Sequence, residues 1–196
     1  MSASIAPTVE RLPLDGLIKL TARVFQDARG EFFETWNKAA FAAIGIDAEF
    51  VQDNLSISTR AGTLRGIHFQ KGGAAQAKLI RCITGMIRDV VVDLRPESRT
   101  FGQWLAVPLS AAAADALFIP KGFGHGFITL EDNTIVAYKT DAFYAPEAEG
   151  SIRWNDPDLQ IQWGPEAFAS TPILSEKDAC APSWQAVRAA LAQTPA

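Results

Sequence analysis

Short runs of β-branched and aromatic residues recur along the middle of the chain, and Gly, Pro, Asn and Asp separate them at short intervals. This spacing is typical of an antiparallel sandwich or closed barrel rather than of βαβ units. The pattern predicts strands over 31–36, 50–58, 63–70, 77–85, 86–94, 102–110, 116–120, 124–130 and 134–144. Within "AKLIRCI" (77–83), charged and apolar residues mix without clean alternation, which indicates a polar but enclosed face, as in a barrel with a wet interior.

Two segments have helical signals instead. The segment "NKAAFAAIG" (37–45) opens on Asn37, a candidate N-cap, and ends at Gly45. Near the C-terminus, "SWQAVRAALAQ" (183–193) has Ser183 as a candidate cap and apolar residues at helical spacing. We therefore predict a mainly all-β chain with a few short peripheral helices.

The 196 residues are enough for one large domain, which would bury about 70% of the surface that the unfolded chain exposes. No internal repeat, low-complexity stretch or linker divides the sequence, so we expect a single domain over 1–196. Residues 145–151 are the most loop-like segment of the second half.

The charge balance argues against two classes of partner. With 18 basic and 22 acidic residues the net charge is −4, and no basic stripe could neutralise a phosphate backbone, so we expect no nucleic-acid binding. The apolar runs are too short for a membrane span, and the N-terminus has no signal-peptide pattern.

Cys82 and Cys180 lack metal-ligand or redox spacing, which favours two packed free thiols in a reducing cytoplasm.

His68 and His125 are the only histidines, and they lie on different predicted strands. A buried, satisfied core histidine is the ordinary interpretation, while two histidines and a carboxylate could form a facial triad for iron or manganese. A triad requires a carboxylate one or two residues after His68, where Phe69 and Gln70 stand instead, so we expect no metal. Gly-rich phosphate loops, nucleophile elbows and Cys-x-x-Cys pairs are absent from the sequence.

The sequence leaves the orientation of several polar side chains open. Arg65 and His68 are three apart and would face opposite ways in a regular strand, unless Gly66 hosts a β-bulge. Lys78 could lie on the surface, or it could face a barrel interior and stabilise a developing negative charge. Tyr138 could be a core aromatic or a proton donor.

Eight segments together resemble one enzyme family. They are "VFQDARGEFFETW", "FVQDNLSIS", "LRGIHFQ", "QAKLIRCITG", "DVVVDLRPESRTFGQW", "FIPKGFGHGF", "AYKTDAFYAPEAEGSIRWNDPDLQIQW" and "LSEKDACAP". In this order they are similar to the dTDP-4-dehydrorhamnose 3,5-epimerases, from about residue 20 to residue 182. Several of the segments are long and unusual.

The resemblance implies a cupin-type jelly roll, a homodimer, and no metal or other cofactor. It implies a cytoplasmic isomerase that inverts C3 and C5 of a dTDP-4-keto-6-deoxyhexose, a step toward dTDP-L-rhamnose for cell-wall or O-antigen polysaccharides. By position, His68 matches the base, Asp178 the carboxylate that orients it, Tyr138 the acid that returns a proton, and Lys78 the group that stabilises the enolate. The positions that match contacts to the nucleotide, its diphosphate or the sugar are Arg29, Glu34, Gln52, Asn54, Arg65, His125, Tyr144, Glu149 and Lys177.

Three alternatives stay open at this stage. A related enzyme could invert only C3 or only C5, or could be a ketoisomerase, although the presence of both His68 and Tyr138 favours the double epimerase. A metal-dependent cupin oxygenase would contain iron or manganese. A sugar-binding cupin without catalysis would have no reason to keep a base, an acid and an orienting aspartate together.

Overall fold

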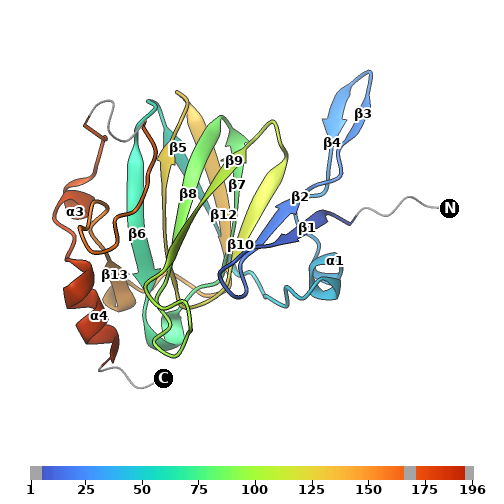
Figure 1. The fold of residues 1–196 in the computed structure, drawn as a ribbon. Helices are drawn as coiled ribbons and strands as arrows, with labels where there is room; N and C mark the ends of the chain where they lie inside the picture. The colour runs from blue at the N-terminus through green and yellow to red at the C-terminus, as the bar shows by residue number, and fades with distance from the viewer. Residues whose placement is uncertain (1–5, 166–170, 193–196) are drawn as a thin grey trace.

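The computed structural model describes residues 6–165 and 171–192, which form two large antiparallel sheets with short helices at the periphery (Figure 1). The six-stranded sheet has the order β1-β2-β10-β7-β12-β5. Its strands are β1 (Thr8–Arg11), β2 (Ile18–Thr21), β5 (Gln52–Ser58), β7 (Lys78–Thr84), β10 (Asp115–Ile119) and β12 (Thr134–Thr140). Apart from the consecutive strands β1 and β2, neighbours in this sheet are distant in sequence, as in a jelly roll.

The five-stranded sheet has the order β13-β6-β11-β8-β9. Its strands are β6 (Leu64–Gln70), β8 (Met86–Asp93), β9 (Trp104–Ser110), β11 (Phe123–Thr129) and β13 (Glu149–Ser151). Side chains of both sheets meet in one apolar core, in which Ile80 and Val136 come from the first sheet and Val91 and Phe127 from the second. The predicted all-β, cupin-type jelly roll is confirmed.

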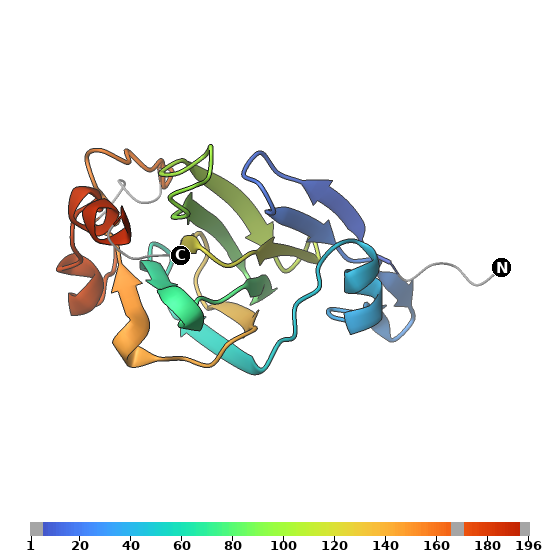
Figure 2. The same ribbon diagram turned by 90° about the horizontal axis from the view of Figure 1, so that it is seen from below.

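Each sheet also carries a cover on its outer face, and Figure 2 shows the two covers at opposite ends of the molecule. Helix α1 (Lys38–Ala43) places Phe41 against the six-stranded sheet. Helix α4 (Trp184–Ala192) packs Trp184 and Val187 beside the five-stranded sheet. Asn37 caps α1 as predicted, since its Oδ1 accepts a hydrogen bond from the amide of Ala40 at 3.1 Å.

The predicted strand over 31–36 is wrong for most of its length. Strand β4 (Gly30–Phe32) is short and pairs only with β3 (Phe25–Asp27), in a hairpin that projects from the body of the molecule (Figure 1). The chain then leaves the hairpin, and the Trp36 ring packs edge-on against Phe41 with 4.5 Å between ring centroids. The aromatic residues that suggested a strand belong instead to a local cluster beside α1.

Short elements account for the other differences from the predicted pattern. Strands β1, β2, β3 and β13 were not expected, because three or four residues are too few to show a period. Strand β12 ends at Thr140, and the next residues turn across the end of the sandwich. The segment 145–151, expected to be a loop, contains the 3₁₀ turn η2 (Pro146–Ala148) and β13.

The two cysteines differ in environment. Both are free thiols, and Cys82 is buried as expected, whereas Cys180 is exposed, so packing does not explain it. Within the described residues, no helix is long and apolar enough to cross a membrane.

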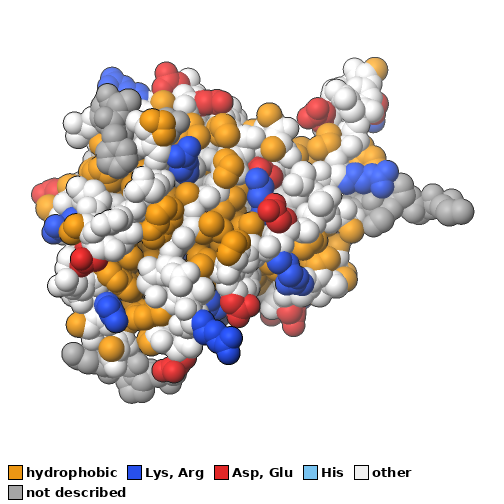
Figure 3. Space-filling model, in the orientation of Figure 1, with side chains coloured by type: hydrophobic (Ala, Val, Ile, Leu, Met, Phe, Trp, Pro, Cys, Tyr) orange, Lys and Arg blue, Asp and Glu red, His pale blue; other side chains and the backbone are white. Residues whose placement is uncertain are grey.

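The edge strand β5 has inverted polarity. Ser56 and Ser58 turn toward the interior, while Leu55 and Ile57, on the opposite face, have 61% and 59% of their surface exposed. Figure 3 shows further hydrophobic side chains, coloured orange, exposed on the face of the molecule that it presents. This arrangement gives the sandwich a polar wall inside one end, and it leaves an apolar strip outside.

Candidate active site

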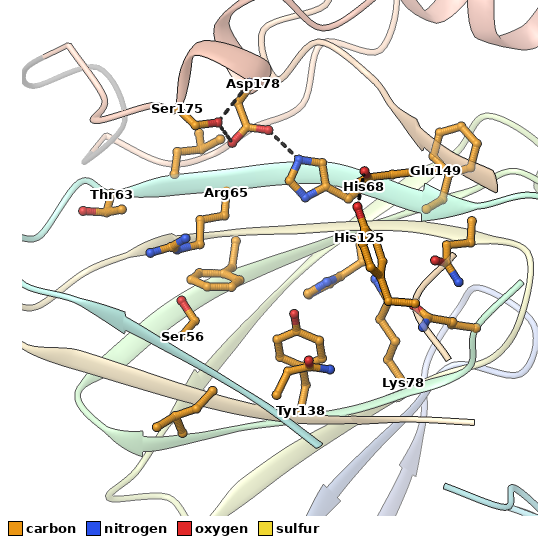
Figure 4. Close-up of a pocket in the computed structure, with 18 of the residues that line it drawn as sticks. Ser56, Thr63, Arg65, His68, Lys78, His125, Tyr138, Glu149, Ser175 and Asp178 are labelled. Atoms are coloured by element: carbon orange, nitrogen blue, oxygen red, sulfur yellow. Dashed lines mark hydrogen bonds and ion pairs between the residues drawn. The ribbon is translucent and has the colours of Figure 1, made fainter. Parts of the chain in front are cut away.

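A cavity of about 710 Å³ opens at the end of the sandwich where β5, β6 and β12 lie. It continues the space between the sheets beyond the apolar core, and side chains of both sheets reach into it (Figure 4). The sequence-predicted residues that line it are Gln52, Asn54, Arg65, His68, Lys78, His125, Tyr138, Tyr144, Glu149 and Asp178. Their convergence from separate strands makes this cavity the candidate active site.

A bulge in β6 turns Arg65 and His68 toward the same cavity. His68 pairs with His125 and Arg65 pairs with Phe127, so β6 has one residue more than β11 between the two pairs. Gly66 has φ of +124°, and a Cβ there would lie 2.4 Å from the Cα of Gly126. Only glycine allows this backbone and this close approach of the two strands.

His68 and Asp178 form a hydrogen-bonded pair. Nε2 of His68 lies 2.5 Å from Oδ1 of Asp178, and Asp178 is 97% buried, with an exposed fraction of 3%. Burial alone would raise the pKa of Asp178, but hydrogen bonds from His68 and Ser175 hold that pKa below its ordinary value. The ionised carboxylate only accepts, so Nε2 carries the proton and Nδ1 is free to accept one.

A short helix delivers Asp178 to this position. Ser175 caps α3 (Glu176–Ala179), where its hydroxyl accepts the amide hydrogen of Asp178 and donates to Oδ2 of the same residue at 2.9 Å. The "LSEKD" segment carries the Ser-x-x-Asp spacing of such a cap, which was the available sequence signal. Asp178 is therefore a buried helical residue held by its own N-cap.

His125 belongs to a second pair, with a residue that the sequence reasoning missed. Its Nε2 lies 2.7 Å from Oδ2 of Asp89, and Asp89 is fully buried on β8. Burial lowers the pKa of His125, and the Asp89 carboxylate opposes that effect. An acidic residue inside the apolar run "IRDVVVD" is the signal that could have indicated it, because a buried charge needs a partner.

Lys78 faces the cavity from the first residue of β7. It is 9% exposed, and within the described residues its ammonium makes no hydrogen bond or ion pair. Burial lowers the pKa of Lys78 to about 8, although Asp89 and Glu149 act in the opposite direction. The interior position, and not the surface position, is the one observed, and it places a cation beside His125 in the cavity (Figure 4).

Tyr138 lies on the wall opposite His68. It comes from β12 in the six-stranded sheet, whereas His68 comes from β6 in the five-stranded sheet, and Figure 4 shows the space between them. Burial raises the pKa of the Tyr138 phenol, and the nearby Arg65 lowers it in part. The phenol therefore stays protonated at neutral pH and can donate a proton.

Glu149 organises the mouth of the cavity. Its carboxylate accepts a hydrogen bond from the hydroxyl of Tyr144 at 2.8 Å and pairs with Nζ of Lys177 at 2.5 Å. Burial opposes the ionisation of Glu149, but the contacts with Lys177 and Tyr144 hold its pKa below the ordinary value. Lys177 itself does not line the cavity and reaches it only through this ion pair.

Arg29 and Glu34 are not brought to this cavity. Arg29 lies in the β3–β4 hairpin, where its guanidinium is 2.6 Å from Oδ2 of Asp27, and its side chain is 89% exposed. Glu34 accepts a hydrogen bond from the side chain of Asn37 at 3.0 Å. Within one chain, the two residues lie apart from the other predicted contacts.

The cavity also contains polar residues that were not predicted. Ser56, Thr63, Gln70, Gln76 and Ser175 line it. Within the described residues, no group of three or more His, Cys, Asp or Glu side chains could hold a metal ion. The arrangement provides an imidazole, a phenol on the opposite wall and a buried cation, groups that suit proton transfer beside a carbonyl group.

Comparison with known proteins identifies the family. The model of the family described as dTDP-4-dehydrorhamnose 3,5-epimerase matches residues 11–186. The dTDP-4-dehydrorhamnose 3,5-epimerase of Salmonella typhimurium is 47% identical over 175 residues, which cover 89% of this chain and 93% of that protein.

Solved structures agree. The epimerase of Bacillus anthracis, crystallised with TDP and PPi bound, has a TM-score of 0.87 and 45% identity, over 91% of this chain and 99% of that one. The epimerase of Legionella pneumophila, in complex with dTDP-4-keto-L-rhamnose, has a TM-score of 0.86 and 38% identity, over 94% and 96%. On this evidence, the chain belongs to the dTDP-4-dehydrorhamnose 3,5-epimerase family.

Proposed function

We propose that the cavity inverts C3 and C5 of dTDP-4-keto-6-deoxy-D-glucose and yields dTDP-4-keto-L-rhamnose, with His68, Tyr138 and Lys78 as its catalytic groups. The observation that carries these roles is the placement of His68 and Tyr138 on opposite walls, with Lys78 between the sheets. Both carbons flank the C4 ketone, so one set of groups can serve both inversions.

His68 acts as the base. Its Nδ1 accepts the proton from the carbon next to the ketone, and Asp178 stabilises the imidazolium that forms. A histidine suits this step because the ordinary pKa of the imidazole group is near neutral pH, where a general base is most efficient. General-base catalysis increases reaction rates by a factor of about 10² to 10⁴.

Lys78 stabilises the enolate. Removal of the proton places negative charge on the C4 oxygen. A buried ammonium that stabilises this charge can increase the rate by a factor of about 10² to 10³. Within the described residues, the two carboxylates that act on Lys78 are paired elsewhere, Glu149 with Lys177 and Asp89 with His125, which leaves the ammonium available to the substrate oxygen.

Tyr138 completes the inversion. Epimerisation requires the new proton to arrive on the face opposite the one that lost it, and a single base cannot supply it there. The protonated phenol of Tyr138 stands across the cavity from His68, so proton return from Tyr138 gives the inverted configuration. Before the next inversion, the imidazolium of His68 releases its extra proton to solvent, and the phenolate of Tyr138 takes up a proton from solvent.

The remaining polar residues bind the nucleotide and its diphosphate or border the sugar. Gln52, Asn54, Arg65, His125, Tyr144 and Glu149 line the cavity around the reacting centre, and Lys177 supports Glu149. Arg65 suits the diphosphate because a guanidinium can bind two oxygens at once. No cofactor takes part in any of these steps.

A second copy of the chain would supply Arg29 and Glu34. The hairpin that carries Arg29 projects from the body, and Phe32 beside it is 70% exposed, while the outer face of β5 presents Leu55 and Ile57 to solvent. Burying both apolar surfaces against a partner would bring the hairpin of one copy to the nucleotide in the other. We therefore infer a homodimer of single-domain chains, which works in the cytoplasm.

The decisive test is NMR of dTDP-4-keto-6-deoxyglucose incubated with the enzyme in D₂O and EDTA, beside a His68→Asn variant. We expect deuterium at both C3 and C5 with the wild type and none with the variant, while the melting temperatures of the two proteins stay similar. Deuterium at one carbon only would indicate a single epimerase. An absence of exchange with the wild type would overturn the proposal.

A further inference from the structure

Ser56 has a buried hydroxyl without a hydrogen-bond partner among the described residues. The residue lines the active-site cavity, and Figure 4 shows its side chain directed into that space from β5. Buried polar atoms are almost always hydrogen-bonded, and an unpaired one destabilises the folded chain. A partner that arrives only with the substrate would account for it.

The strand register locates this hydroxyl relative to the catalytic groups. Lys78 pairs with Thr140 and Ser56 pairs with Val136, both on β12, and Tyr138 stands between these two positions. Lys78 and Ser56 therefore lie on opposite sides of Tyr138, each two residues along the sheet. Figure 4 shows the same order from Lys78 through Tyr138 to Ser56.

The shape of a hexopyranose ring then indicates which edge of the sugar lies beside Ser56. C4 and C1 are at opposite ends of the ring, so a sugar with its C4 oxygen at Lys78 directs its C1–C2 edge away from Lys78, toward Ser56. Arg65 lies at this end as well, since its guanidinium donates to the carbonyl of Ile57 at 3.4 Å. Arg65 is the group for the diphosphate on C1, which leaves the neighbouring C2 hydroxyl for Ser56.

We infer that the Ser56 hydroxyl binds the C2 hydroxyl of the hexose and makes the enzyme select against 2-deoxy sugars; this assignment rests on the proposed function. A serine hydroxyl can both donate and accept, which matches a sugar hydroxyl. A site built to hydrogen-bond a substrate hydroxyl discriminates against the analogue that lacks it, because its own polar group then stays unpaired.

The test compares Ser56→Ala with the wild type on two substrates, dTDP-4-keto-6-deoxyglucose and its 2-deoxy analogue. We expect the substitution to lower kcat/KM for the first substrate by about 10- to 100-fold and to change kcat/KM for the analogue by less than about twofold. The matched control is Ser58→Ala, which removes the other β5 hydroxyl that is buried without a partner among the residues that the structure describes, and which does not line the cavity. It should leave kcat/KM for both substrates unchanged.

Stability gives an independent readout. Ser56→Ala removes no hydrogen bond to any residue over 6–165 or 171–192, so its melting temperature should equal or exceed that of the wild type. Equal losses of kcat/KM on both substrates, no loss on either, or a lowered melting temperature would each overturn the assignment to the C2 hydroxyl. If the wild type converts neither substrate, the proposed function fails; if the wild type is active, those results overturn only the role of Ser56.

Discussion

Nε2 of His68 and Oδ1 of Asp178 lie 2.5 Å apart, although 110 residues separate them in the sequence. The contact joins the edge region of the five-stranded sheet to α3, and it fixes which ring nitrogen of His68 carries the proton. The other ring nitrogen, Nδ1, is therefore free to accept a proton, and in the proposed mechanism His68 depends on Asp178 for its tautomer and orientation.

Replacing Asp178 with Asn tests this dependence. The amide can present its NH₂ group to Nε2 and so favour the wrong tautomer, for which we expect kcat to fall by about 10³- to 10⁴-fold. Ser175→Ala, which removes one hydrogen bond to Asp178, should cost about 10-fold or less. Rates of deuterium incorporation at C3 and C5 measure both effects, and an Asp178→Asn enzyme with near wild-type kcat would contradict the orienting role.

The buried Lys78 predicts an alkaline limit to activity. Since burial lowers the pKa of Lys78 to about 8, the ammonium is lost above that pH, and kcat/KM should decline as pH rises through this range. Lys78→Arg keeps a charge that does not titrate there. Its residual activity should not show the decline near pH 8, and a decline that persists in this variant would assign the limit to another group.

Lys78 also makes the free energy of unfolding depend on pH, and this quantity should rise over the pH range in which activity declines. The pKa of Lys78 is about 8 in the folded chain and 10.5 as the ordinary value, so between these pH values the unfolded chain binds more protons than the folded chain. The free energy of unfolding should therefore rise with pH across this window, by up to about 3 kcal/mol from this group. Lys78→Met should be more stable than the wild type at pH 7 and lose this rise, as urea unfolding at several pH values would show.

Gly66 is the backbone position on which the site geometry depends. An alanine there combines positive φ with a Cβ only 2.4 Å from the Cα of Gly126, and we expect a loss of about 2 to 5 kcal/mol in the free energy of unfolding. Gly62→Ala is the matched control, because Gly62 has φ of +77° with no atom within 4 Å of the added Cβ. It should cost only about 1 kcal/mol. Similar losses in the two variants would show that the close approach of β6 and β11 is unimportant.

Mixed dimers test the placement of Arg29. If the hairpin of one copy serves the cavity of the other, Arg29→Ala and His68→Asn chains should each be weak alone but recover activity when they assemble together. In such a hybrid, one cavity carries both defects and the other has neither. Hybrid dimers seen by native mass spectrometry without recovered activity would contradict the shared site, and a monomer in solution would contradict the dimer.

Much of this protein follows from local pattern. Runs of β-branched and aromatic residues between turn residues predict the central strands, because such side chains favour the extended backbone, and Asn37 begins a helix through its own side chain. The motifs around His68, Lys78 and Tyr138 also indicate the family. Short elements such as β13, and the departure of residues 33–36 from the hairpin, are decided by contacts with distant segments, so they leave no local period to read.

What only the tertiary structure decided is which residues meet. Sequence carries no direct record of strand register, and it is register, with the bulge at Gly66, that turns Arg65 and His68 into one cavity. Folding likewise brings Asp89 to His125, keeps Arg29 out of the cavity of its own chain, and buries the hydroxyl of Ser56 without a partner in the part of the chain that the structure describes. These relationships join segments far apart in the chain, whose contacts depend on how the whole sandwich packs, whereas local propensity depends only on neighbouring residues.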